Sequence, residues 1–422
     1  MSPYPRLIRA PEADQRARAR AALLAAVLVL AVAPAPQARA EDRAELERVV
    51  LSHYDAGFLG RARAYHMPRY AVYFLRTAVV LGVAWALTAG PLGRWSEGAL
   101  GWAGGHRWAA RALLLTLLHL GVALLSLPFT IWRYLHARAY GLRHDAWGEF
   151  LADWAKGLGI GWVLVLVVGL LVLACFAAWP RWGWALATAA VGALALLYTA
   201  AAPLVVDPLF NRFTRMADRD MEERLLDLAR AGGVPAREVW VADASRRSRT
   251  VNAYFTGLGS TRRIVVYDTL VGKFPPAETA LVVAHEVGHW RHRHIALGLA
   301  LGIAGAGLGL FLGQAVLSRL ADSGWRGLSG RGDPVLVLPA YALYLTLSLA
   351  ALLPSNWISR RMEVQADCAA LELTGDPETF ISTEVRLARE NLSDVLPPAW
   401  IETLLYTHPA NARRILLAEA AR

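Results

Sequence analysis

Six apolar stretches, each long enough to cross a bilayer, constrain the fold of this chain more than any other feature. A membrane helix needs about 20 apolar residues at about 1.5 Å per residue. Hydrophobic residues make up 56% of the chain and charged residues 18%, a composition that excludes disorder and argues against an ordinary soluble enzyme. We therefore predict a mostly α-helical membrane protein with six or seven transmembrane helices. The six stretches are 71–89, 109–132, 157–178, 183–204, 295–320 and 335–353.

The first 40 residues allow two interpretations. Three arginines precede an apolar stretch at 21–33, and Ala38-Arg39-Ala40 follows it. This order is typical of a secretory signal peptide with a small-residue cleavage site. The alternative is an uncleaved first transmembrane helix, although Pro34 and Pro36 disfavour a long helix there. We therefore assign 1–40 to a signal peptide or to a first membrane anchor.

Two polar blocks divide the rest of the chain. The sequence predicts an N-terminal membrane domain with four spans at 41–204, a polar block at 205–293, a transmembrane helix pair at 294–353 and a second polar block at 354–422. Glycine and serine residues between 323 and 332 are typical of the turn inside that pair. One water-facing unit is thus expected to be split by two membrane helices.

The formal net charge of +10 bears on membrane orientation. Cytoplasmic loops carry excess Lys and Arg, and no nucleic-acid recognition motif occurs, so we predict no nucleic-acid partner. The positive-inside rule places the polar blocks in the cytoplasm, whereas a cleaved signal peptide would place them outside, and both orientations stay open. The short segments on the side of the polar blocks (41–70 and 133–156) hold 9 basic residues, against 6 on the other side (90–108, 179–182 and 319–333).

The segment 281–294 carries the clearest chemical signal. It contains His285-Glu286-Val287-Gly288-His289, which is H-E-x-x-H. On a helix, residues four apart share a face, so both imidazoles can bind one metal ion. Glu286 lies beside them and can take a proton from a metal-bound water. A helix with incidental histidines is the alternative. The nearby His292 and His294 are interpreted as basic residues at the membrane interface.

A catalytic zinc site needs three protein ligands and one open position. Glu363 and Asp367 are four apart, so on a helix they would share a face. Glu363 can bind the metal, and Asp367 can hold a ligand imidazole by a hydrogen bond. The alternative is a solvated acidic face paired with Arg360 and Arg361. The chain has only two cysteines, which leaves His and Glu as ligands and favours a catalytic over a structural zinc site.

Together these segments resemble the type I CAAX prenyl endopeptidases, membrane-embedded zinc metalloproteases of the gluzincin kind. In that family H-E-x-G-H-W is followed, beyond two membrane helices, by S-R-[RK]-x-E-x-x-A-D, as here at His285–Trp290 and Ser359–Asp367. The resemblance covers roughly 70–420. Since lysine occurs only at positions 156 and 273 and arginine is abundant, we expect a bacterial member. Four further segments are similar to family motifs, namely F-x-x-D-x-x-K at 150–156, P-L-F-N-x-F at 208–213, S-x-x-x-N-A-Y-F-x-G at 248–257 and T-H-P…R-I at 407–415.

The resemblance implies a zincin-like catalytic domain, formed by the two polar blocks, and a role for each motif residue. One Zn²⁺ would be bound by His285, His289 and Glu363, with Glu286 as general base and Asp367 as the partner of a ligand imidazole. His408 would stabilise the oxyanion of the reaction. Asn252 and Arg414 would bind substrate. For Asn252 a turn residue, and for Arg414 a structural salt bridge, remain the alternatives.

The predicted function is therefore an integral-membrane zinc metalloendopeptidase that hydrolyses peptide bonds with a zinc-activated water. Its partners would be peptide or membrane-protein substrates and membrane lipid. The resemblance also implies a large chamber enclosed by the membrane helices. The eukaryotic members of the family cut prenylated tails, but the sequence does not carry that substrate over, nor does it predict an oligomeric state. The alternative is a non-proteolytic membrane scaffold with a structural zinc site, for which no fourth ligand is evident.

Overall fold

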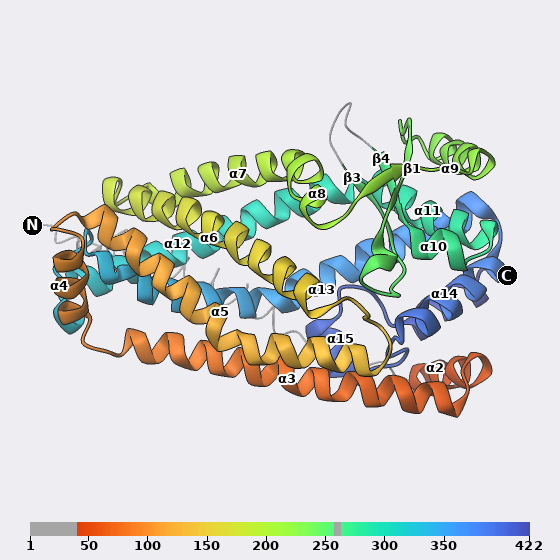
Figure 1. Ribbon diagram of the computed structural model, residues 1–422, viewed down its shortest axis with the longest axis horizontal. Helices are drawn as coiled ribbons and strands as arrows, with labels where there is room; N and C mark the ends of the chain where they lie inside the picture. The colour runs from red at the N-terminus through yellow and green to blue at the C-terminus, as the bar shows by residue number, and fades with distance from the viewer. Residues whose placement is uncertain (1–39, 257–262) are drawn as a thin grey trace, which may run out of the picture.

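The computed structural model describes residues 40–256 and 263–422 (Figure 1). Residues 1–39, on which the choice between signal peptide and membrane anchor depends, lie outside the described residues. In the described part, 6 helices are long and apolar enough to cross a membrane, which confirms the six predicted spans. These are α3 (Ala56–Thr88), α5 (Arg107–Ala139), α6 (Trp147–Ala178), α7 (Gly183–Val205) continued by α8 (Asp207–Phe210), α12 (His294–Asp322) and α13 (Val337–Thr374).

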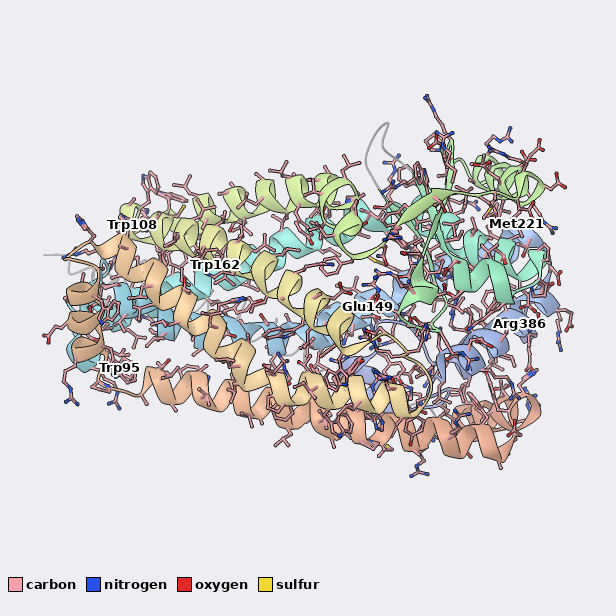
Figure 2. The ribbon with its side chains drawn as sticks, in the orientation of Figure 1. Trp95, Trp108, Glu149, Trp162, Met221 and Arg386 are labelled. Carbon is pink, nitrogen blue, oxygen red and sulfur yellow. The ribbon has the colours of Figure 1, made fainter. Side chains whose placement is uncertain are left out.

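The membrane helices form a bundle with an apolar exterior. Only 11% of the most apolar 18-residue window of α5, α6 and α7 is buried inside the protein, as expected for helices that face lipid. Trp108 and Trp162 are exposed on this bundle, whereas Met221 and Arg386 lie at the opposite end of the molecule (Figure 2). The short helix α4 (Leu92–Trp102) lies across the end of the bundle that is remote from the sheet (Figure 1).

α13 crosses the predicted border at 353/354 without interruption. Its 38 residues extend about 57 Å, nearly twice the hydrocarbon thickness of a bilayer. Pro354 lies inside the helix, where it lacks one backbone N–H. Glu363 and Asp367 therefore sit on the continuation of a membrane helix, so the second polar block is joined to the bundle by a continuous helix.

A four-stranded sheet in the order β1-β2-β4-β3 lies beyond the bundle. β2 and β4 are parallel, and the other two pairs are antiparallel. The buried Val239, Ile264 and Val266 pack against α9 (Arg219–Ala231) and α11 (Pro276–Arg291). β3 lies at the edge and pairs only with β4 among the described strands. The strands are β1 (Phe213–Arg215), β2 (Val239–Ala242), β3 (Ala253–Thr256) and β4 (Arg263–Tyr267).

The start of the chain packs against its end. Leu46 and Val49 of α2 (Ala40–His53) are fully buried in one cluster with Phe380 and Ile415. Arg48 Nη2 lies 2.8 Å from Glu419 Oε2. α2 thus belongs to the core of the second polar block, although the sequence groups it with the membrane domain. The remaining helices of this end are α10 (Asp268–Lys273), α14 (Pro377–Asn391), α15 (Ala399–Leu405) and α16 (Asn411–Glu419).

The membrane helices surround a cavity of about 1140 Å³. Its wall comes from α5, α6, α7, α12 and α13 and is largely apolar, with His119, Tyr341 and Ser359 among its polar residues. It reaches Met362, which directly precedes Glu363. A chamber of the kind that the resemblance implies is therefore present, and it borders the region of the predicted metal ligands.

Candidate active site

α11 brings the two predicted histidine ligands together. His285 Nε2 and His289 Nε2 lie 3.1 Å apart, one helical turn from each other. The buried Val283, Ala284 and Val287 hold this helix in the protein core. His285, Glu286 and His289 form a group whose potential ligand atoms all lie within 4.8 Å of one another.

Glu363 on α13 supplies the third group. Its Oε2 lies 3.2 Å from His285 Nε2, and its Oε1 lies 3.5 Å from His289 Nε2. A tetrahedral zinc ion with ligand distances of about 2.0–2.1 Å separates its donor atoms by about 3.3 Å. In addition, Glu363 Oε2 is buried and has no hydrogen-bond partner among the described residues. The spacing, the donor types and this unpartnered oxygen all fit a zinc ion.

Asp367 accepts a hydrogen bond from the side of the His285 ring that faces away from the proposed metal position. His285 Nδ1 donates a hydrogen bond to the fully buried Asp367 Oδ1 at 2.8 Å, which leaves Nε2 directed at the metal position. Burial disfavours the imidazolium, but the hydrogen bond to Asp367 and the nearby carboxylate of Glu363 outweigh burial and raise the pKa of His285 to about 10. The role that the resemblance implies for Asp367 agrees with its contacts.

Arg414 completes the support. Its Nε donates to Asp367 Oδ2 at 2.8 Å, and its Nη1 lies 2.7 Å from Glu384 Oε1. Glu384 also accepts a hydrogen bond from Asn411 at 3.0 Å. Burial disfavours the charge on Arg414, yet the two carboxylates raise its guanidinium pKa further. These contacts match the alternative interpretation of Arg414, in which it forms a structural salt bridge.

Glu286 faces a small pocket beside the ligands. This pocket, of about 260 Å³, is also lined by Phe255 of the edge strand, His289 and Trp290. Burial raises the pKa of the Glu286 carboxyl above its ordinary value. A carboxylate with a raised pKa beside a pocket that water can enter is suited to accept and return a proton.

His408 lies on the loop after α15 and approaches the same centre. Its Nε2 is 3.3 Å from Glu363 Oε2, and its side chain is 58% exposed. Its Nδ1 hydrogen-bonds Thr407 Oγ1 at 2.9 Å. An imidazole that borders the ligand Glu363 and remains open can reach a bound substrate.

Asn252 stands apart from this cluster in its hydrogen bonds. It immediately precedes β3, and its Oδ1 accepts a hydrogen bond from the N–H of Ala253. Its carbonyl oxygen accepts from the N–H of Tyr267 at 3.0 Å. These are the contacts of a residue that begins the edge hairpin.

The sequence did not predict the contacts of two residues near the site, His294 and Arg360. His294, which we interpreted as a basic residue at the membrane interface, is only 6% exposed and lies 2.9 Å from His289, so that interpretation is wrong. Arg360, which pairs with an acidic face only in the alternative interpretation of its segment, donates to backbone oxygens of Glu402 and Tyr406. Only the S-R-[RK] part of the family motif marks Arg360, and the H-E-x-x-H motif ends before His294.

Comparisons with known proteins show which families this chain resembles. The model of peptidase family M48 matches residues 215–421, and the model described as CAAX prenyl protease N-terminal, five membrane helices, matches 39–212. The chain is 33% identical over 220 residues to the uncharacterized metalloprotease YhfN of Bacillus subtilis, which covers 51% of each protein. It is 28% identical over 381 residues to a CAAX prenyl protease 1 homolog of Oryza sativa, which covers 86% of this chain and 87% of that protein.

The fold has a counterpart among solved structures. The crystal structure of S. mikatae Ste24p superposes with a TM-score of 0.77 at 24% identity, over 88% of this chain and 90% of that one. CAAX prenyl protease 1 of Saccharomyces cerevisiae is 31% identical over 229 residues, so this match, like that to YhfN, spans about half the length of the relative. With its two matching family models and its zinc-ligand geometry, the chain belongs to peptidase family M48 and is a membrane metalloprotease like the CAAX prenyl proteases.

Proposed function

We propose that the chain is a zinc endopeptidase that cuts peptides or membrane proteins at the border of the apolar cavity. The observation that carries this proposal is the convergence of His285, His289 and Glu363 at 3.1–3.5 Å, with Glu286 beside an accessible pocket. Three ligands leave one coordination position open for water, as catalytic zinc sites require. We infer one zinc ion per chain.

Each residue of the proposed site has a separate role in hydrolysis. Zinc, when bound, lowers the pKa of a water and polarises the substrate carbonyl. Glu286 accepts the proton of the attacking water at its carboxylate and returns it to the nitrogen of the leaving amine. His408 donates a hydrogen bond to the carbonyl oxygen as negative charge develops on it. β3, whose other edge pairs with no described strand, would offer that edge to an extended peptide, and Asn252 at its start would bind the peptide backbone.

The cavity supports a substrate with an apolar part. It is bordered by membrane helices and reaches Met362, so a membrane-embedded or lipid-carrying segment can occupy it while the adjoining peptide lies at the ligands. Relatives of this chain include CAAX prenyl proteases, and a prenylated peptide is one probe of this class.

Glu286→Gln tests the proposed chemistry. The purified variant should keep its zinc and lose about 10²- to 10⁴-fold in the cleavage rate of a fluorogenic peptide, because the general base is gone. Glu372→Gln is the matched control, since this exposed carboxylate lies on the outer part of α13. Full activity of Glu286→Gln with zinc bound would refute the proposal.

We also propose that the chain is bacterial, since it is rich in arginine and nearly free of lysine.

We further propose that the catalytic end faces the cytoplasm, as the distribution of basic residues favours. A cysteine introduced at the exposed position of Arg237, in a Cys368→Ala background where the remaining Cys175 is buried, would report the membrane side to an impermeant thiol reagent. Labelling in intact cells would contradict the cytoplasmic orientation.

A further inference from the structure

We propose that His294 is a positioning residue that fixes the ring orientation and tautomer of His289, a proposed zinc ligand, and that Gln365 in turn orients His294. The inference rests on the proposed zinc site. It adds a series of hydrogen bonds from His289 through His294 to Gln365. His294 is the first residue of α12 and is buried. Its Nδ1 lies 2.9 Å from His289 Nδ1, and its Nε2 lies 2.9 Å from Gln365 Oε1.

Only one order of protons lets His289 bind a metal. Its Nε2 faces Glu363 and His285 and must keep a free electron pair, so its proton is on Nδ1. That N–H then donates to His294 Nδ1, which has to be unprotonated. The proton of His294 consequently lies on Nε2 and is donated to the carbonyl oxygen of Gln365. The opposite order would place a proton on His289 Nε2, where it blocks the metal.

The two histidine ligands are thus held by different chemistry. His285 donates to the carboxylate of Asp367, whereas His289 donates to a neutral imidazole. Ligand histidines usually hand their second N–H to an acceptor that fixes ring orientation and tautomer, and the loss of that acceptor weakens metal binding. An imidazole can also act as a donor, so the acceptor Gln365 Oε1 on its other side is needed to select the productive tautomer.

The backbone supports this assignment. In one continuous helix, residue 294 would lie about 140° around the axis from His289 and would point elsewhere. α11 instead ends at Arg291, and Arg293 adopts a left-handed conformation with φ 56° and ψ 35°. Such a conformation is uncommon for a residue other than glycine and persists where the surroundings require it. The turn brings His294 back beside His289 and joins α11, α12 and α13 at the metal site.

The decisive measurement is the zinc dissociation constant, obtained by competition with a chelator. We expect His294→Leu to raise this constant by about 10- to 100-fold. His294→Asn should recover part of the loss, because its Oδ1 can accept the Nδ1–H of His289. Gln365→Leu should weaken zinc binding in the wild-type background and have no further effect in His294→Leu. His292→Leu is the matched control, since His292 is exposed and stacks on His294 with its ring 5.6 Å away.

A second readout separates positioning from folding. Cobalt-substituted His294→Leu should show an altered visible absorption spectrum, while the metal-free variant melts at the same temperature as metal-free His292→Leu. A dissociation constant within twofold of wild type in His294→Leu would overturn the proposal, as would His294→Asn behaving like His294→Leu. If the wild-type protein binds zinc without cleaving any peptide, the proposed function fails, but these binding measurements still decide the role of His294.

Discussion

Gly288 and Ala366 lie so close that no side chain fits between them. A Cβ at Gly288 would be 2.8 Å from both the Cα and the carbonyl oxygen of Ala366, and 3.0 Å from the Cβ of Ala369. The contact joins α11, between His285 and His289 in the sequence, to α13, at the residue before Asp367. The glycine inside the H-E-x-G-H motif is thus what allows the third ligand to approach.

Gly288→Ala is therefore expected to destabilise the protein and weaken its zinc site together. The added methyl group meets backbone atoms that cannot rotate away, and overpacking of this kind costs about 1–3 kcal/mol. Thermal unfolding in detergent and zinc content would measure both effects. Gly272→Ala on α10 is the control, because a Cβ there meets nothing within 4 Å. Wild-type stability and zinc content in Gly288→Ala would contradict the argument.

Asp367→Asn should lower zinc affinity by about 10- to 100-fold. The amide keeps an acceptor for His285 Nδ1 but loses the charge that faces Arg414. Chelator competition measures the change. Arg414→Lys should fall between wild type and Asp367→Asn, since lysine keeps the charge and loses the paired hydrogen bonds. Unchanged zinc affinity in Asp367→Asn would show that its hydrogen bond to His285 does not position the ligand.

Arg360→Met should lower kcat/KM by about 10- to 100-fold while zinc affinity stays unchanged. Arg360 donates to the carbonyl oxygens of Glu402 and Tyr406, at 2.9 and 2.6 Å, and so holds the segment that leads into His408. Loss of the guanidinium frees that loop without touching a ligand. The control is Arg361→Met, because Arg361 is exposed and lies over the ring of Trp357. Equal kcat/KM values for the two variants would refute this role.

We expect Asp394 and Asp376 to change the stability of the protein with pH in opposite directions. Burial raises the pKa of Asp394, which accepts a hydrogen bond from Tyr70 at 3.0 Å. Its ionised form is therefore disfavoured in the fold, and its contribution to the unfolding free energy falls as pH rises from about 3.9, the unfolded value, through the raised pKa. Asp394→Asn should raise the melting temperature at pH 8 and have little effect at pH 4.

Asp376 provides the reverse case. Hydrogen bonds from the hydroxyl and the N–H of Thr379 lower its pKa. Its stabilisation is present above about 3.9 and is lost as pH falls through the lowered pKa of the folded state. Asp376→Asn should therefore melt at a lower temperature at pH 8, with a deficit that shrinks toward strong acid. Shifts of the same sign for both aspartate variants at pH 8 would contradict the assignment of the two pKa directions.

Much of the architecture follows from local pattern. The apolar stretches predict the six spans, and the repeat of four between His285 and His289 places both imidazoles on one face. The spacing between Glu363 and Asp367 indicates one ligand and one supporting group. Their assignment to a single zinc centre came from the ordered family motifs, since spacing alone left a solvated acidic face possible.

The parts that could not be predicted depend on contacts between distant segments. α2 shares a buried core with α14 and α16, and its Arg48 meets Glu419. Arg360 reaches the carbonyl oxygens of α15 instead of a carboxylate. No periodicity in the chain marks such partners, because each lies on an element whose place is decided by packing.

The sequence by itself determined which residues bear charge, which segments enter lipid and which side chains can bind zinc, because hydropathy and helical spacing are local properties. Only the tertiary structure decided how closely α11 and α13 approach, which depends on the missing side chain of Gly288. It also decided that the left-handed turn at Arg293 returns His294 to His289. A single backbone angle reverses the direction of a side chain there, and residue spacing cannot reveal that angle.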